Sequence, residues 1–251
     1  MRERFAEITA MDRAIGKLRS DLKQRGLREN TLVWYCGDNG IPPSGLAESR
    51  LRALKGYVYE GGTRVPGIIE WPARIARPRA TSVAAVTSDM LPTLCEIAGI
   101  DLPRRPLDGI SLVPLLDGSM TTRAKPICFW KGVRIGQGQK AGPYIDPELQ
   151  KGTTPLVKLA GGRPTRNFGN QRYLEIRDND FGGPRAILNK DYKLVVDGEK
   201  GSGVELFNLK NDPGETNNLA AEKPELTRQL QSRLKTWQQS VLNSLLGNDY
   251  K

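Results

Sequence analysis

The 251-residue chain carries 38 Lys and Arg against 28 Asp and Glu, which gives a formal charge of +10, and it contains no histidine. Its length fits one large or two small domains, and its 38% apolar content indicates a globular protein with a buried core. Without histidine these residues form neither a Ser-His-Asp triad nor a histidine-ligated zinc site. Chemistry at a site in this chain must therefore rest on carboxylates, amides, lysines, arginines or hydroxyls.

The first half of the chain has the pattern of an α/β sheet. Apolar residues spaced by three or four over the first 25 residues predict an amphipathic helix. The run from Thr31 to Cys36 predicts a strand buried on both faces, and a second strand is expected from Val65 to Trp71. A helix is predicted to begin at a cap formed by Thr87 or Ser88 and to end at Gly99.

The second half begins with a glycine-rich basic segment from Lys131 to Arg172, which supplies +6 of the net charge. It fits a solvated loop or a basic lip that attracts an anionic substrate, and it lacks the interleaved aromatic residues that stack on bases, so we expect no nucleic-acid partner. Strands are then predicted at 192–196 and 205–209, and a long helix from near Pro224 to Leu245. We expect two domains, residues 1–125 and 126–251, the second ending in a small α+β unit.

Three short observations limit the remaining options. The cysteines Cys36, Cys95 and Cys128 are odd in number and far apart, so we expect no CxxC metal site and interpret each as a small buried residue. No apolar run is long enough to cross a membrane, and the first residues lack the apolar core of a signal peptide. We therefore expect a chain without a membrane partner and without a signal peptide of its own.

Polar residues follow the first predicted strand, where α/β sheets commonly bind ligands. Asp38 and Asn39 offer a carboxylate and an amide oxygen, which are hard ligands of the kind that Ca²⁺ and Mg²⁺ accept. Two ligands leave most of a shell of about six oxygens to other residues. Asp-Asn-Gly is also an ordinary turn sequence, so the tripeptide alone decides little.

The run that follows carries a family resemblance. Residues 51–66 read LRALKGYVYEGGTRVP, residues 89–94 read DMLPTL, and residues 205–215 read ELFNLKNDPGE. With Asp-Asn-Gly before them, these motifs resemble the type I sulfatases of the alkaline phosphatase-like superfamily. The resemblance implies part of an alkaline phosphatase-like α/β sheet sandwiched by helices, together with a small C-terminal α+β domain made of a short antiparallel sheet and a long terminal helix.

The resemblance also implies a function for the candidate residues. It makes Asp38 and Asn39 ligands of a divalent cation, Ca²⁺ with Mg²⁺ as the substitute, and it makes Lys55 a contact of the sulfate group in a sulfate ester such as a sulfated glycan. A cation and an ammonium beside sulfate oxygens stabilise the negative charge there, and losing one such group typically costs about 3 to 4 kcal/mol of barrier lowering. Glu60 and Arg64 are interpreted as structural, with a mutual ion pair that fixes the loop.

One hallmark of the family is absent from these 251 residues. The nucleophile is a formylglycine made from the first residue of a Cys-x-Pro-Ser-Arg motif or its serine equivalent, and neither motif occurs. We therefore expect the carboxy-terminal portion of a sulfatase, inactive alone, with an exposed apolar face that associates with other chains or with a missing amino-terminal half. By resemblance the complete enzyme is periplasmic or secreted.

Three alternatives stay open at this point. The chain is compatible with a phosphatase or phosphonate hydrolase relative, because the superfamily shares the use of a metal and an oxyanion site. It is also compatible with a non-catalytic fragment that binds sulfated glycans or other polyanions through the basic segment. The third alternative is the product of a broken gene.

Overall fold

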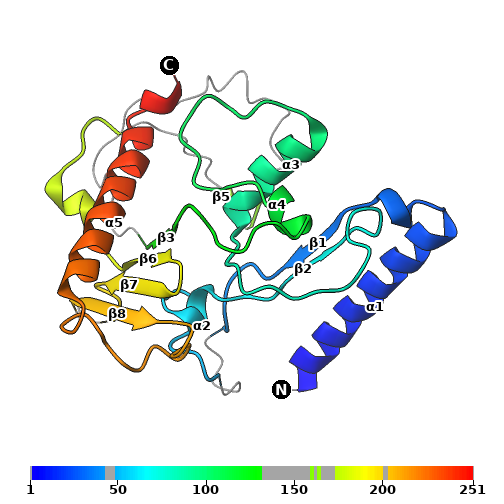
Figure 1. Cartoon of the computed structure of the whole chain (residues 1–251), viewed down its shortest axis with the longest axis horizontal. Helices are drawn as coiled ribbons and strands as arrows, with labels where there is room; N and C mark the ends of the chain where they lie inside the picture. Colours follow the sequence, from blue (N-terminus) through cyan, green and yellow to red (C-terminus); the bar gives the residue numbers. More distant parts are fainter. Residues whose placement is uncertain are drawn as a thin grey trace.

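A computed structural model describes residues 2–42, 49–131, 159–160, 163–164, 173–199 and 203–250 (Figure 1). The described helices and strands, in chain order, are α1 (Arg2–Gln24), β1 (Val33–Cys36), α2 (Glu60–Thr63), β2 (Gly67–Glu70), α3 (Met90–Ala98), α4 (Val113–Leu116), β3 (Ile127–Trp130), β4 (Leu159–Ala160), β5 (Arg163–Pro164), β6 (Arg185–Asn189), β7 (Tyr192–Val196), β8 (Val204–Asn208) and α5 (Pro224–Leu245). Short 3-10 turns lie at Arg28–Asn30, Thr87–Asp89, Asp178–Phe181 and Asn248–Tyr250. The predicted mixed α/β arrangement is confirmed.

The amino-terminal part is a two-stranded antiparallel sheet with α1 beside it (Figure 1). Strand β1 pairs antiparallel with β2, from Val33 opposite Glu70 to Cys36 opposite Gly67. Helix α1 is tied to this sheet by Arg19, whose Nε lies 2.6 Å from a Glu70 oxygen, and Arg28 contacts the same carboxylate at 2.8 Å. The expectation that β1 is buried on both faces is wrong, because all four of its residues are partly exposed and its described partner is a single short strand.

The segment from residue 86 to residue 123 is organised around one buried carboxylate. Asp89 accepts hydrogen bonds from the backbone N–H groups of Val86 and Ile110, and Arg123 binds it with two guanidinium nitrogens at 2.7 and 2.8 Å. Thr87 and Ser88 lie in the 3-10 turn before α3 and do not cap it, so that part of the prediction is wrong. The helix ends at Gly99 as expected, with a left-handed φ of 65°.

The carboxy-terminal part is a four-stranded antiparallel sheet in the order β3-β6-β7-β8. Side chains alternate between its two faces, as the pleat of a strand requires. One face packs on α5 through Ile187, Leu194, Leu206, Leu230 and Leu234. The other face packs on the segment before α2 through Val58, Tyr59, Ala186, Val195 and Phe207. The sheet therefore lies between the last helix and residues from the first quarter of the chain.

Two predictions from the sequence are not tested by the described residues. The basic segment falls outside them except for Lys131 and the strands β4 and β5, and the division at residue 125 stays a prediction. Within the described ranges, no helix is both long enough and apolar enough to span a bilayer.

Candidate functional site

The loop after β1 is held by backbone hydrogen bonds to two segments further along the chain. Gly40 N–H donates to the carbonyl of Gly62 at 2.9 Å, and Ile41 N–H donates to the carbonyl of Gly61 at 3.1 Å. The N–H of Lys55 donates in turn to the carbonyl of Ile41 at 2.7 Å. The loop that carries the adjacent residues Asp38 and Asn39 is thus fixed between α2 and the backbone of Lys55.

Glycine is required where these segments touch. A Cβ atom on Gly40 would lie 1.9 Å from the carbonyl oxygen of Gly61, and one on Gly61 would lie 2.2 Å from the carbonyl oxygen of Ala53. Any side chain at either position would collide with backbone, which has no rotamer with which to yield. The glycines of the motif therefore serve close backbone packing.

The side-chain oxygens of the loop are of the type that binds hard cations. Asp38 and Lys55 are exposed residues, and Asn39 is partly buried. A carboxylate and an amide oxygen are normal ligands of Ca²⁺ and Mg²⁺, which take six or more oxygens. In the part of the chain that the structure describes, no group of three or more acidic, cysteine or histidine residues lies together as a metal cage. The fit is therefore correct in ligand type and incomplete in ligand number.

A buried ion cluster anchors α2 to the carboxy-terminal sheet. The Lys193 ammonium on β7 lies 2.8 Å from a Glu60 oxygen and 3.2 Å from a Glu215 oxygen. Glu215 also accepts the N–H of Glu60 at 2.7 Å. Burial raises the pKa of the Glu215 carboxyl, and the positive charge of Lys193 opposes that rise in part.

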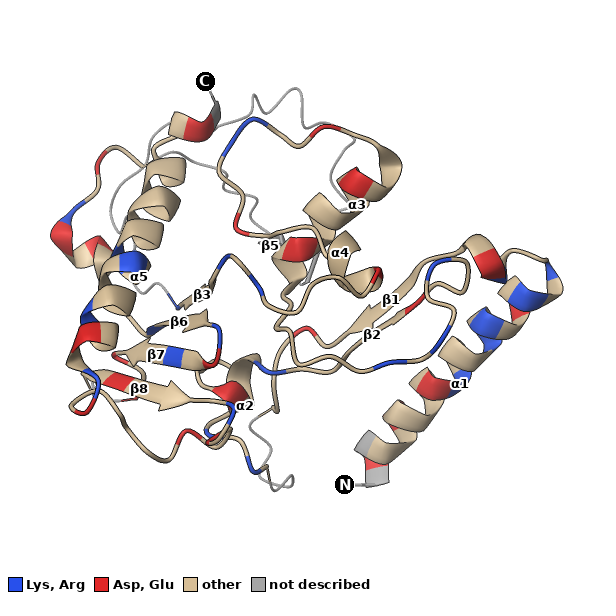
Figure 2. Ribbon diagram, viewed as in Figure 1, with Lys and Arg blue, Asp and Glu red and all other residues tan. Residues whose placement is uncertain are grey.

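A second polar contact holds the start of the same segment. Arg52 donates to Glu205 at 2.9 Å and to Glu199 at 3.2 Å, and its guanidinium stacks on the Tyr59 ring 4.0 Å from the centroid. The Tyr59 hydroxyl donates to the other Glu205 oxygen. Figure 2 shows both signs of charge gathered where α2 meets β7 and β8.

The predicted pairing of Glu60 with Arg64 is found in the structure, but it is not the main contact of Glu60. The two charges are 3.8 Å apart and the Arg64 side chain is 57% exposed, so their contact is weak. The principal partner of Glu60 is Lys193, which lies 133 residues further along the chain. Sequence reasoning missed Lys193 because the residue lies in an ordinary strand pattern. The signal that could have revealed it is a charged residue within a strand that is otherwise apolar.

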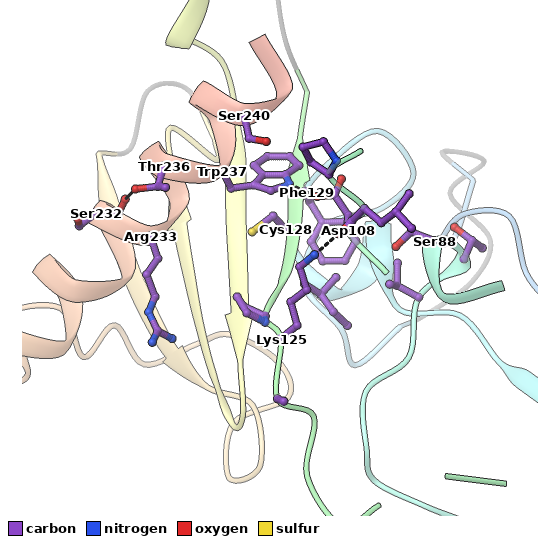
Figure 3. Close-up of a pocket in the computed structure, with 17 residues that line it drawn as sticks. Ser88, Asp108, Lys125, Cys128, Phe129, Ser232, Arg233, Thr236, Trp237 and Ser240 are labelled. Atoms are coloured by element: carbon purple, nitrogen blue, oxygen red, sulfur yellow. Dashed lines mark hydrogen bonds between the residues drawn. The ribbon is translucent and has the colours of Figure 1, made fainter. Parts of the chain in front are cut away.

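A cavity of about 890 Å³ lies elsewhere, between α5 and the segment that leads into β3 (Figure 3). Trp237 and Asp108 share a hydrogen bond of 2.8 Å in its wall, and Lys125 donates to the carbonyl of Leu107. Cys128 also lines it, where burial raises the pKa of its thiol to about 12, which keeps the sulfur protonated and unreactive. The lining residues do not include Asp38, Asn39 or Lys55.

Comparison with known proteins gives consistent results. The sequence model of the family described as "Sulfatase" matches residues 1–100. Human arylsulfatase A is 40% identical over 129 residues, which are 49% of this chain and 25% of that protein. A sulfatase from Formosa agariphila is 31% identical over 250 residues, which are 92% of this chain and 38% of that protein.

The fold has solved counterparts as well. The structure of Ps i-CgsB, solved in complex with k-i-k-neocarrahexaose, superimposes with a TM-score of 0.67 at 22% identity, over 93% of this chain and 42% of that one. The chain spans between a quarter and about two fifths of the length of these relatives. At this identity the likeness establishes the fold, which is that of the sulfatases and of the alkaline phosphatase-like proteins.

Proposed function

Because this chain belongs to the type I sulfatase family, we propose that it serves in the hydrolysis of sulfate esters, with the loop after β1 as part of the site. Asp38 and Asn39 bind a divalent cation, Ca²⁺ or Mg²⁺ in its place, and Lys55 contacts the sulfate. The observation that carries the proposal is the pair of hydrogen bonds from Ile41 to Gly61 and from Lys55 to Ile41, which joins the two motifs.

Each residue has a role that follows from its charge. The Asp38 carboxylate and the Asn39 amide oxygen hold the cation, and the bound cation supplies positive charge beside the sulfate oxygens. The Lys55 ammonium donates hydrogen bonds to the non-bridging oxygens, whose negative charge grows as the ester bond breaks. A fixed ammonium in that position typically lowers the barrier by about 3 to 4 kcal/mol.

The proposal includes the expectation that these 251 residues alone do not turn over a sulfate ester, since they contain no formylglycine motif. The purified chain, assayed with an aryl sulfate and added calcium, should show only background hydrolysis. Turnover well above background would contradict this part of the proposal and would require a different nucleophile.

The substrate class follows from relatives only in outline. We propose a sulfated glycan or an aryl sulfate, because the fold is shared with a protein solved with an oligosaccharide and the sequence is related to an N-acetylglucosamine-6-sulfatase. The proposed location is periplasmic or secreted, and it rests on the family resemblance alone.

A binding experiment tests whether the proposed site, rather than another part of the chain, holds the sulfate ester. We expect an aryl sulfate to shift the amide NMR signals of Gly40, Ile41 and Lys55 in a saturable way that requires Ca²⁺. Lys55→Ala should weaken this binding about tenfold, the loss of roughly one charge-assisted hydrogen bond. Lys210→Ala removes an exposed lysine just past β8 and serves as the matched control.

The same titration distinguishes the competing functions. Binding that ignores chelators and Asp38→Ala, and that falls steeply with salt, would favour a polyanion-binding protein over a sulfatase site. An equal response to an aryl phosphate would favour the phosphatase alternative.

A further inference from the structure

The buried ammonium of Lys193 lies against α2, the short helix whose carbonyl groups accept hydrogen bonds from the loop after β1. We infer that Lys193 is a positioning residue, which fixes α2 on the carboxy-terminal sheet and thereby holds Asp38, Asn39 and Lys55 in place. The inference rests on the proposed function for the meaning of those three residues, and its structural part stands independently.

The first step is the geometry of the buried charges. The side chains of Lys193 and Glu215 are fully buried and that of Glu60 is 9% exposed. Lys193 contacts both carboxylates, and it lies 3.4 Å from the hydroxyl of Thr63. A buried ammonium is tolerated only where such partners surround it. Because Glu60 and Thr63 are the first and last residues of α2, one side chain from β7 touches both ends of this helix.

The second step is the weakness of α2 by itself. It has four residues, two of them glycine, and its own backbone hydrogen bonds are local, such as that from Arg64 N–H to the Glu60 carbonyl at 2.8 Å, so they do not fix its position on the sheet. The apolar contacts of Val58 and Tyr59 with the sheet supply attraction without direction. The ion contacts are directional, and they fix how α2 is placed on β7.

The third step leads from α2 to the loop. The carbonyl groups of Gly61 and Gly62 in α2 accept the N–H groups of Ile41 and Gly40. Asn39 directly precedes Gly40, and the backbone N–H of Lys55 donates a hydrogen bond to the carbonyl of Ile41. A displaced α2 would therefore move the backbone of all three proposed site residues. Among the described residues, no hydrogen bond or ion pair joins Lys193 to any of the three, so its effect on them would pass through α2.

Hydrogen exchange of individual amides tests the inference directly. In Lys193→Met we expect the amides of Gly40, Ile41 and Lys55 to exchange at least about tenfold faster, beyond any change in global stability measured by urea unfolding. Leu194→Ala is the matched control, since the adjacent residue points to the other face of β7 and packs on α5. It should lower global stability without selective exposure of the three amides.

A second variant keeps the test decisive if Lys193→Met fails to fold. Glu60→Gln preserves the shape of the side chain and leaves Lys193 paired with Glu215, and it should also speed exchange of the three loop amides. Unchanged protection in the folded variants, or the same loss in Leu194→Ala, would overturn the inference.

A metal titration connects the inference to function. If the wild-type chain binds Ca²⁺, the dissociation constant should rise severalfold in Lys193→Met and stay unchanged in Leu194→Ala. An unchanged constant in Lys193→Met would overturn the positioning role. If the wild-type chain binds no Ca²⁺, the proposed function fails, while the exchange experiment still decides whether Lys193 positions the loop.

Discussion

Glu215 combines two unusual properties at a single residue. It is a fully buried carboxylate, and its backbone has a left-handed φ of 55°, which a side chain with a Cβ rarely adopts. It faces Lys193 and Glu60, one cation and one further carboxylate. Burial is the main cause that raises the pKa of the Glu215 carboxyl, and the negative charge of Glu60 adds to the rise, whereas Lys193 opposes it.

The raised pKa leads to a prediction about pH. A carboxyl that holds its proton more tightly when folded stabilises the fold at low pH and loses that contribution as the pH rises above the unfolded value, near 4.5. The unfolding free energy of wild type minus that of Glu215→Gln should therefore fall between pH 4 and pH 7, measured by urea unfolding. A difference that rises with pH would mean that the ion pair with Lys193 outweighs burial.

At the level of residues, sequence reasoning found what lies in local motifs. Asp38, Asn39 and Lys55 were identified from short stretches of chain, and the structure links their backbones through Ile41. Their roles remain predictions. Lys193 was missed because its importance depends on Glu60 and Glu215, which are distant in sequence and meet it only in the folded chain.

Among the elements, α2 shows how a motif is shaped by close backbone packing. Its two glycines allow the segment 52–57 to approach closely, and Gly40 allows the loop after β1 to approach α2. Because the neighbouring atoms belong to backbone, relief would require a shift of whole segments.

Gly61→Ala tests this packing. Its new Cβ would lie 2.2 Å from the carbonyl oxygen of Ala53, so we expect a loss of about 2 to 3 kcal/mol in unfolding free energy, the upper part of the range for overpacking. Gly16→Ala in α1 is the control, since no atom lies within 4 Å of the added Cβ, and it should gain about 0.5 to 1 kcal/mol. Equal stability of Gly61→Ala and wild type in chemical denaturation would show that the loop is not closely packed.

The elements that sequence reasoning recovered are those with strong periodicity or clear end signals. The helices α1 and α5, the end of α3 at Gly99 and the strands β7 and β8 are confirmed. Strands β3 and β6 were missed, since β3 is a four-residue apolar run without alternation and β6 becomes a strand by pairing between β3 and β7. The one-turn helix α2 was missed because two of its four residues are glycine.

At the scale of the whole molecule, the described residues of α1 present a stripe of exposed apolar side chains. Phe5, Ile8 and Leu18 are 61%, 55% and 49% exposed, and Ile68 on β2 is 62% exposed. Exposed apolar surface of this kind, on a helix and an adjacent strand, is typical of a surface that meets another protein segment.

Association should follow from that surface. We expect the purified chain to bind an apolar dye and to form larger species with increasing concentration in sedimentation experiments. Phe5→Ser combined with Ile8→Ser should reduce both effects, because it removes two strongly exposed apolar side chains without touching the ion pair between Arg19 and Glu70. A wild-type chain that stays monomeric and dye-free would contradict this expectation.

The central claim is that the loop after β1 is a divalent cation site, and a calorimetric calcium titration tests it most directly. The wild-type chain should bind one Ca²⁺ weakly, with a dissociation constant of about 10⁻³ M or above, since it offers few of the usual ligands. Asp38→Ala should abolish the binding heat, whereas Asp101→Ala, which removes an exposed carboxylate elsewhere, should not change it. Equal binding by wild type and Asp38→Ala would contradict the assignment of this loop as the metal site.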